Sequence, residues 1–152
     1  MKTIDTNLNN NHINEVHRIN YLTTEMESLY HAASLKMGIS DSTSIILYSI
    51  YDNNGTCLLN DICKKSGTSK QTINSAIRKL EKDNLIYLKN YNGKSKQLFW
   101  TDKGKEFVEK TVAKLYQAEA KAFDEWNEEE IRNYIRMMEK YANCLRFQIE
   151  KL

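Results

Sequence analysis

The stretch 58–100 places the strongest constraint on the fold, because it combines two helical patterns with a hairpin signal. A short helix over residues 58–66 is followed by Gly67, a typical C-terminal stop. A second helix is predicted over residues 69–83, where Ser69 can cap it by accepting bonds from its free amides. The apolar residues of this second helix recur at three- to four-residue spacing and so share one face: Ile73, Ala76, Ile77 and Leu80.

The opposite face of the second helix is polar, and its side chains are of types that bond base edges and phosphates. This face carries Lys70, Gln71, Asn74, Ser75 and Arg78. Gln71 and Asn74 are candidates for adenine edges, while Lys70 and Arg78 can meet guanine or phosphate. We interpret the segment as a DNA recognition helix in a winged helix-turn-helix.

Two β-rich runs follow, over residues 85–89 and 97–100. Between them, Asn92 and Gly93 form the favoured pair for a two-residue hairpin turn, because both turn positions need a positive φ. A lysine-bearing hairpin tip can simply keep a protein soluble, but its position after the recognition helix favours a wing that contacts phosphate or the minor groove. The residues at or beside the tip are Lys94, Ser95 and Lys96.

The net charge of +2 is unevenly distributed along the 152 residues. Residues 61–110 hold twelve Lys or Arg against six Asp or Glu, a net charge of +6, whereas the remainder holds ten against fourteen, or −4. An ordinary lysine-rich surface would account for this charge alone. Its coincidence with the predicted recognition helix favours a segment that meets phosphates.

The remaining sequence predicts further helices around this motif, and thus a mainly α fold. An imperfectly amphipathic helix is expected over about 11–36, after polar residues 1–10 that we expect to be frayed. A second helix follows the capping residues 40–42, and one long helix is expected from 102 to 123. A capping-box pattern at 127–130 starts the last helix.

These helices predict a homodimer. We expect a single domain over 1–152, with a winged-helix region at about 40–104 and dimerisation helices at about 11–36 and 105–152. The apolar stripes of the terminal helices could fold back on one chain, but packing against a second copy by two-fold symmetry is the more economical arrangement. Two recognition helices would then face successive major grooves roughly 34–36 Å apart and read a pseudo-palindrome.

Composition excludes several other classes of protein. Hydrophobic content of 41% and charged content of 28% are typical of a soluble globular chain. No apolar run approaches the roughly 20 residues of a membrane helix. The N-terminus lacks the layout of a secretion signal, so we expect a cytoplasmic protein without a membrane partner. Nothing resembles a nucleophile with its base or a phosphate-binding glycine loop, so we expect no enzyme and no cofactor.

The cysteines and histidines do not form a recognisable metal site. The histidine spacings do not place two ligands on one helical face, so no metal is expected at His12, His17 or His31. The cysteines have neither zinc-finger spacing nor an even count, and they are Cys57, Cys63 and Cys144. Thiol-based redox sensing stays open, because neighbouring lysines could lower the pKa of an exposed cysteine, whereas burial would make it inert.

From the first long helix to the last, the chain resembles the MarR family of bacterial transcriptional regulators. The segment 73–81 followed by Leu85-Ile86 resembles the family's recognition helix and its "Leu-Glu, short linker, Gly-Leu-hydrophobic" exit. The segment 101–104, Thr-Asp-Lys-Gly, resembles its "Thr-x-x-Gly" start to the helix after the wing. Two positions depart from the pattern: Asn84 stands where the family often has glycine, and the wing offers lysines in place of Asp-x-Arg.

This resemblance implies an obligate homodimer that binds operator DNA, usually as a repressor, and that a small-molecule effector or an oxidant can release. We expect the DNA contacts to come from two elements: Ser69, Lys70, Gln71, Thr72, Asn74, Ser75 and Arg78 in the helix, and Lys94, Ser95 and Lys96 in the wing. Because lysine lacks the fork of arginine, the wing is expected to contact phosphate. The main alternative is a winged helix that binds a protein partner.

Overall fold

The computed structural model describes residues 12–152. The frayed segment expected at residues 1–10 and the helix start expected at Asn11 lie outside these residues. The chain forms two compact units, one ending at Val112 and the other comprising Ala113–Leu152. Within the described part of the chain, no helix is both long and apolar enough to cross a membrane.

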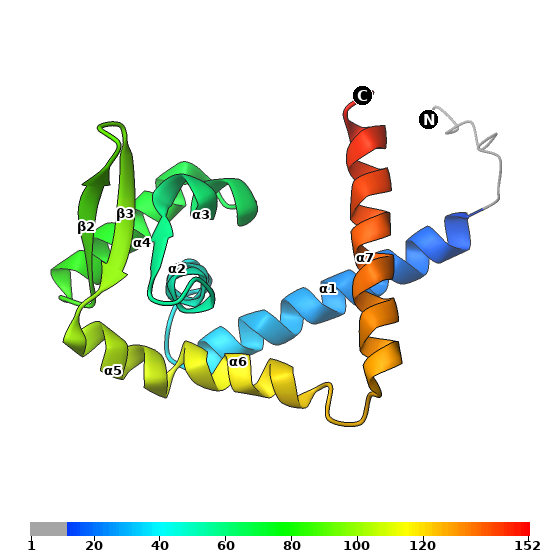
Figure 1. Ribbon diagram of the computed structural model, residues 1–152, viewed down its shortest axis with the longest axis horizontal. Helices are drawn as coiled ribbons and strands as arrows, with labels where there is room; N and C mark the ends of the chain where they lie inside the picture. The colour runs from blue at the N-terminus through cyan, green and yellow to red at the C-terminus, as the bar shows by residue number, and fades with distance from the viewer. Residues whose placement is uncertain (1–11) are drawn as a thin grey trace, which may run out of the picture. The chain divides into compact units, whose positions relative to one another are not determined.

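Two helices begin the first unit (Figure 1). α1 spans Ile13–Lys36 and α2 spans Asp41–Asp52. The Ser40 Oγ accepts the Thr43 amide proton at 3.2 Å, so the predicted cap of α2 is confirmed. α1 meets α2 at its C-terminal end, where the His31 Nδ1 lies 2.8 Å from the Asp41 Oδ2.

The helix-turn-helix consists of α3, Leu59–Lys65, and α4, Lys70–Lys82. Ser69 caps α4, as expected. Past the end of α4, Asn84 has φ 57°, the left-handed conformation in which asparagine is better tolerated than other non-glycine residues. The helix stop predicted at this asparagine is therefore confirmed.

The sheet has three strands where two were predicted. β1, β2 and β3 span Thr56–Leu58, Ile86–Tyr91 and Ser95–Trp100, and the antiparallel order is β1-β3-β2. β1 pairs with β3 through Thr56–Phe99 and Cys57–Leu98, so residue 58 ends a strand and does not begin the helix as expected. The strand was missed because it is three residues long and pairs with a partner distant in sequence.

The hairpin loop also differs from the prediction. Asn92 and Gly93 do have positive φ, 51° and 70°. However, Tyr91 pairs with Ser95, so the loop contains three residues, and the Lys94 amide donates to the Asn92 carbonyl at 2.8 Å. The loop therefore carries one lysine itself, and the other lies on β3.

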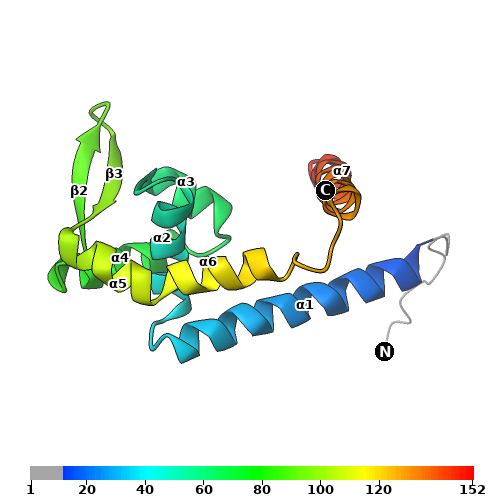
Figure 2. The same cartoon turned by 60° about the horizontal axis from the view of Figure 1, so that its bottom comes forward.

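The core of the first unit lies between α2, α4 and the sheet, which Figures 1 and 2 show side by side. α2 contributes three completely buried residues, Ile46, Leu47 and Ile50. These pack in one cluster with Ile73 and Leu80 of α4, with Leu98 of β3 and with Val108. The buried stripe of α4 is therefore as predicted, and it fixes which face of this helix reaches solvent.

The predicted single helix over 102–123 is wrong, because it is broken into α5, Asp102–Lys110, and α6, Val112–Lys121. At the break, Thr111 has φ −124° and ψ −101°. Its Oγ1 donates to the Phe107 carbonyl at 2.7 Å. Hydroxyls that bond back to the preceding turn weaken a helix slightly and often bend it, and this bond lies at the interruption.

α5 starts against the end of β3. The Thr101 Oγ1 donates to the Asn84 carbonyl at 2.7 Å and accepts the Gly104 amide proton at 2.9 Å. A Cβ at Gly104 would overlap the carbonyl oxygen of Leu85, so only glycine permits this approach. The Thr-x-x-Gly segment therefore joins α5 to the chain that leaves α4.

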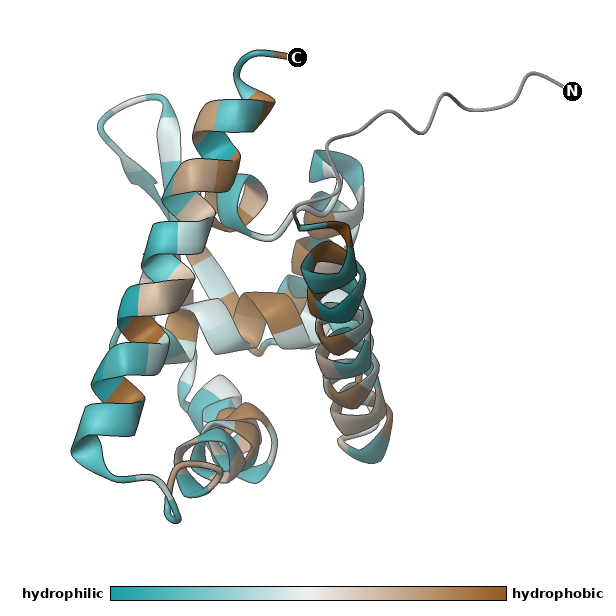
Figure 3. Cartoon of the chain, turned by 90° about the vertical axis from the view of Figure 1, so that its right-hand side faces the viewer, coloured by the Kyte–Doolittle hydropathy of each residue, from teal (hydrophilic) through white to brown (hydrophobic). Residues whose placement is uncertain are grey.

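The second unit contains α7, Glu128–Ile149. The Asn127 Oδ1 accepts the Glu129 and Glu130 amide protons at 2.9 and 3.0 Å, and Glu130 Oε2 accepts the Asn127 amide proton at 2.8 Å, so the predicted capping box is confirmed. Figure 3 shows apolar residues recurring along the helix that reaches the C-terminus. None of the residues of α7 is buried.

Candidate nucleic-acid interface

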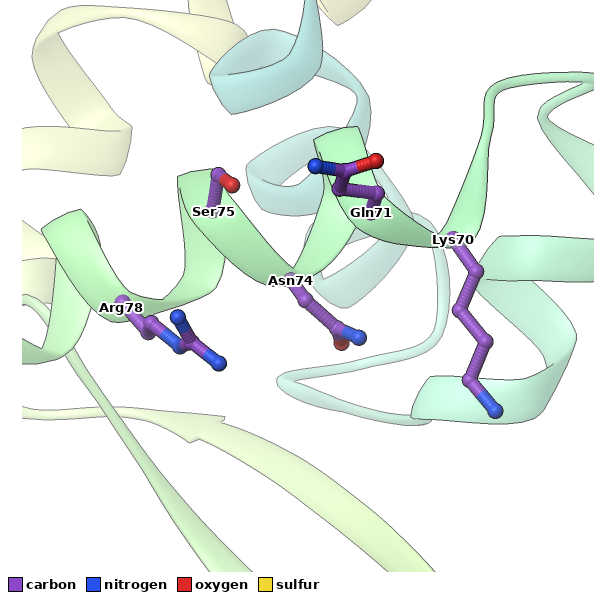
Figure 4. Close-up of a pocket in the computed structure, with 5 residues that line it drawn as sticks. All are labelled: Lys70, Gln71, Asn74, Ser75 and Arg78. Atoms are coloured by element: carbon purple, nitrogen blue, oxygen red, sulfur yellow. The ribbon is translucent and has the colours of Figure 1, made fainter.

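The polar face of α4 is exposed because the opposite face is held in the core. Ile73 is completely buried and Leu80 nearly so. Figure 4 shows five side chains in two rows along the exposed side of the helix. They line one open hollow and are Lys70, Gln71, Asn74, Ser75 and Arg78. The structure therefore brings together five of the seven residues expected to contact DNA from this helix.

The other two, Ser69 and Thr72, bond each other at the start of α4. The Ser69 Oγ accepts the Thr72 amide proton at 3.1 Å, and the two hydroxyl oxygens lie 2.8 Å apart. One hydroxyl proton is used in this pair and the other remains able to reach a phosphate. These residues hold the first turn of α4 in place.

The wing residues form a separate part of the interface. Lys94 lies in the hairpin loop, and Ser95 and Lys96 begin β3. Both lysines are exposed, whereas Ser95 is half-buried. None of the three lines the hollow on α4, so they would have to reach a different part of the same ligand.

Two further lysines lie close to this interface along the chain and were not selected from the sequence. Lys64 and Lys65 occupy the exposed last turn of α3, directly before the turn that leads into α4. In a helix-turn-helix, the first helix crosses the nucleic-acid backbone. The run of two lysines shortly before Gly67 is the signal that could have identified them as candidates for phosphate contact.

Another lysine, Lys89, is held on the sheet. Its Nζ lies 5.5 Å from the ring centre of Tyr87 and 5.3 Å from that of Phe99, and these two rings stack on each other at 5.3 Å. Cation–π attraction of this kind favours one position for the ammonium group. Lys103 is likewise engaged, because its Nζ donates to the Asp83 carbonyl at 2.8 Å.

The three cysteines differ in accessibility. Cys57 is buried in the core, and this burial, together with the nearby Asp61 carboxylate, raises the pKa of its thiol to about 12. Cys63 is half-buried and Cys144 is exposed. A thiol that stays protonated is a poor nucleophile, so Cys57 does not have the properties of an oxidant sensor.

His31 has a structural partner in Asp41. The His31 ring beside Asp41 lowers the pKa of that carboxyl, with a smaller effect from a Ser34 hydrogen bond. This contact links α1 to the first turn of α2. No group of three or more His, Cys, Asp or Glu side chains suited to a metal occurs within residues 12–152.

Comparison with known proteins shows which family this segment is similar to. The model of the MarR family matches residues 37–92, from the end of α1 to the hairpin loop. Over these residues the chain is similar to the MarR family. Among curated proteins, none matches this sequence.

Solved structures of several proteins share the fold across most of the chain. NMB1585, a MarR family regulator from Neisseria meningitidis, has a TM-score of 0.79 at 14% identity, covering 91% of this chain and 99% of that one. The MepR–DNA complex of S. aureus gives 0.65 at 21%, covering 86% and 95%. BpsR of Bordetella bronchiseptica, whose DNA binding is regulated by 6-hydroxynicotinic acid, gives 0.60 at 18%, covering 82% and 98%.

Proposed function

We propose that this protein is a MarR-type, sequence-specific transcriptional regulator that binds a pseudo-palindromic operator as a homodimer and acts as a repressor. The observation that carries the proposal is the exposed face of α4, where two cations and two amides line one hollow opposite a buried stripe. This combination suits a helix placed in the major groove. DNA is the ligand of the MepR structure, which supports the same partner here.

The contacts would divide between base edges and phosphates. We assign base edges to the amides Gln71 and Asn74, and leave Lys70 and Arg78 to guanine or phosphate. The wing lysines, Lys94 and Lys96, would contact phosphate. Ser69 and Thr72 would support the first turn, and Ser75 and Ser95 would add hydroxyl contacts.

Exposed apolar residues on the terminal helices support the homodimer. On α1, Tyr21 is 61% exposed and Leu29 is 65% exposed, and on α7, Met138 is 53% exposed. Apolar surface at this density on a long helix is usually covered by a partner. A second copy with two-fold symmetry covers the same stripe in both chains and also supplies the second recognition helix that a pseudo-palindrome requires.

Release by a small molecule would need an effector that binds one conformation of the dimer more tightly than the other. BpsR gives a precedent for such regulation on this fold. We assign no effector-binding residues. A regulator that acts on the genome in this way would work in the cytoplasm.

The proposal is tested by a salt titration of the purified protein on duplex DNA, followed by fluorescence anisotropy. Affinity should fall steeply with salt, because binding releases counterions from the phosphates. Lys94→Ala should weaken all sequences alike and reduce the salt slope by about one unit. Gln71→Ala and Asn74→Ala should instead relax sequence preference.

Two outcomes would contradict this proposal. No measurable binding at low salt would favour the alternative in which the winged helix contacts a protein partner. Equal losses on specific and random duplexes for all three variants would remove the assignment of roles within the interface.

A further inference from the structure

We propose that α4 reads each half-site in a fixed order, with Gln71 at an adenine and Arg78 at a guanine roughly three base-pair steps away. This inference rests on the proposed DNA-binding function and adds the base classes and their spacing. It also selects Arg78 over Lys70 as the residue that recognises guanine.

The first argument is the direction in which these side chains leave the helix. Ile73 and Leu80 mark the middle of the buried face, since they are 0% and 2% exposed. Gln71 and Arg78 each stand two positions before one of them, a rotation of about 200° around the helix axis. Both side chains therefore leave α4 almost directly away from the core and toward the floor of an occupied groove.

Lys70 and Asn74 lie toward the sides of this face. Lys70 stands two helical turns before the buried Ile77, so it projects close to the edge where α4 meets its own unit. That position suits a phosphate contact. Asn74 directly follows Ile73 and is half-buried, whereas Gln71 and Arg78 are exposed. Ser75, two positions after Ile73, is also central, but its short hydroxyl cannot form paired bonds with one base edge. The other two central positions are occupied by one amide and one guanidinium.

The second argument is chemical. A glutamine amide can form two hydrogen bonds with the N6 and N7 edge of adenine, and an arginine fork does the same with O6 and N7 of guanine. Neither Gln71 nor Arg78 is engaged in a hydrogen bond or ion pair described within residues 12–152, so both are available. Lysine, a point charge, has no such fork.

The spacing follows from helix geometry. Gln71 and Arg78 are about two turns apart, or roughly 10 Å along the axis. Successive base pairs rise about 3.4 Å, so this distance corresponds to about three steps. The N-terminal end of a recognition helix lies deepest in the groove. The longer side chain at position 78 therefore compensates for the greater distance from the bases.

The test is a selection from duplexes with a randomised centre, carried out with the wild-type chain and with Arg78→Gln, Gln71→Ala and Lys79→Gln. Lys79 follows Arg78 in the sequence, but its side chain leaves the helix about a quarter-turn away. Lys79→Gln therefore removes an exposed charge without changing the proposed base-reading face, and it is the matched control. Circular dichroism checks that each variant is folded.

Arg78→Gln should replace guanine by adenine at one position of each half-site and weaken binding to the wild-type sequence roughly 10- to 100-fold. Gln71→Ala should abolish the adenine preference about three steps away. Lys79→Gln should lower affinity without changing either preference.

Selection of the same guanine by Arg78→Gln would overturn the inference, as would loss of preference at one shared position in both Arg78→Gln and Gln71→Ala. In either case the wild-type chain would still select a sequence, so the proposed function would stand. A wild-type chain that selects no sequence would refute the function and the inference together.

Discussion

Replacing Gly104 by alanine is expected to destabilise the fold more than the same change at a glycine whose new Cβ would meet only open space. The new Cβ would overlap the Leu85 carbonyl oxygen and approach the Trp100 Cβ to 3.1 Å. That carbonyl accepts the Thr101 amide proton at 3.0 Å and lies 3.4 Å from the Thr101 Oγ1. Relief of the overlap would require α5 to move away from the sheet and would weaken both contacts.

The magnitude follows from these contacts. Overpacking costs about 1–3 kcal/mol, and the main hydrogen bond contributes about 1 kcal/mol. We expect a loss of about 2–4 kcal/mol, which corresponds to a Tm lower by roughly 4–16 °C for a chain of this size. Thermal and urea denaturation, monitored by circular dichroism at one fixed protein concentration, measure both quantities.

Gly67→Ala is the matched control. Gly67 has φ 63°, and a Cβ there meets nothing within 4 Å, so its substitution costs only the left-handed conformation, about 1–2 kcal/mol. If Gly104→Ala were as stable as the wild-type protein, or more stable than Gly67→Ala, the close approach of α5 to the Leu85 carbonyl would be wrong.

Three further predictions concern single contacts. Because burial raises the Cys57 pKa to about 12, the thiol should react with a disulfide reagent only after unfolding. The stability that the buried, protonated thiol provides should be lost as the pH rises from about 9 toward 12. Rapid labelling of Cys57 in the native protein would contradict its burial. The His31 contact lowers the pKa of Asp41, so it stabilises the fold above the ordinary aspartate pKa of about 3.9, and this stabilisation is lost as the pH falls below that value. His31→Ala should therefore shift acid unfolding to higher pH. An unchanged acid midpoint would show that the pair contributes nothing. Met138→Asp should lower the sedimentation coefficient toward that of a monomer, because the charge falls on the exposed apolar stripe of α7. Lys140→Asp, on the other side of α7, should not. Equal effects would argue against an interface on the apolar stripe.

The elements that local chemistry determines were predictable from the sequence. Ser69 caps α4, Asn84 follows its end with a positive φ, and the Asn127 capping box starts α7, because each depends on residues within one or two turns. The polar residues of the candidate interface could also be identified from the sequence, since helical spacing alone places them opposite the buried stripe.

Features that depend on distant contacts were not predictable. β1 exists because Cys57 pairs with Leu98, and three residues are too few for a recognisable alternation. The three-residue loop depends on the Tyr91–Ser95 register, which the pairing of β2 with β3 sets. The burial that raises the Cys57 pKa likewise results from packing that no local pattern encodes.

The hydroxyl pair at the start of α4 has a consequence for the entropy of binding. Because Ser69 and Thr72 already bond each other in the free protein, the first turn of the helix is ordered before a ligand arrives. Fixing one residue's backbone costs about 1–2 kcal/mol, and this ordering has occurred during folding. If α4 binds DNA as proposed, the pair would contribute to affinity through preorganisation, without itself needing to touch a base.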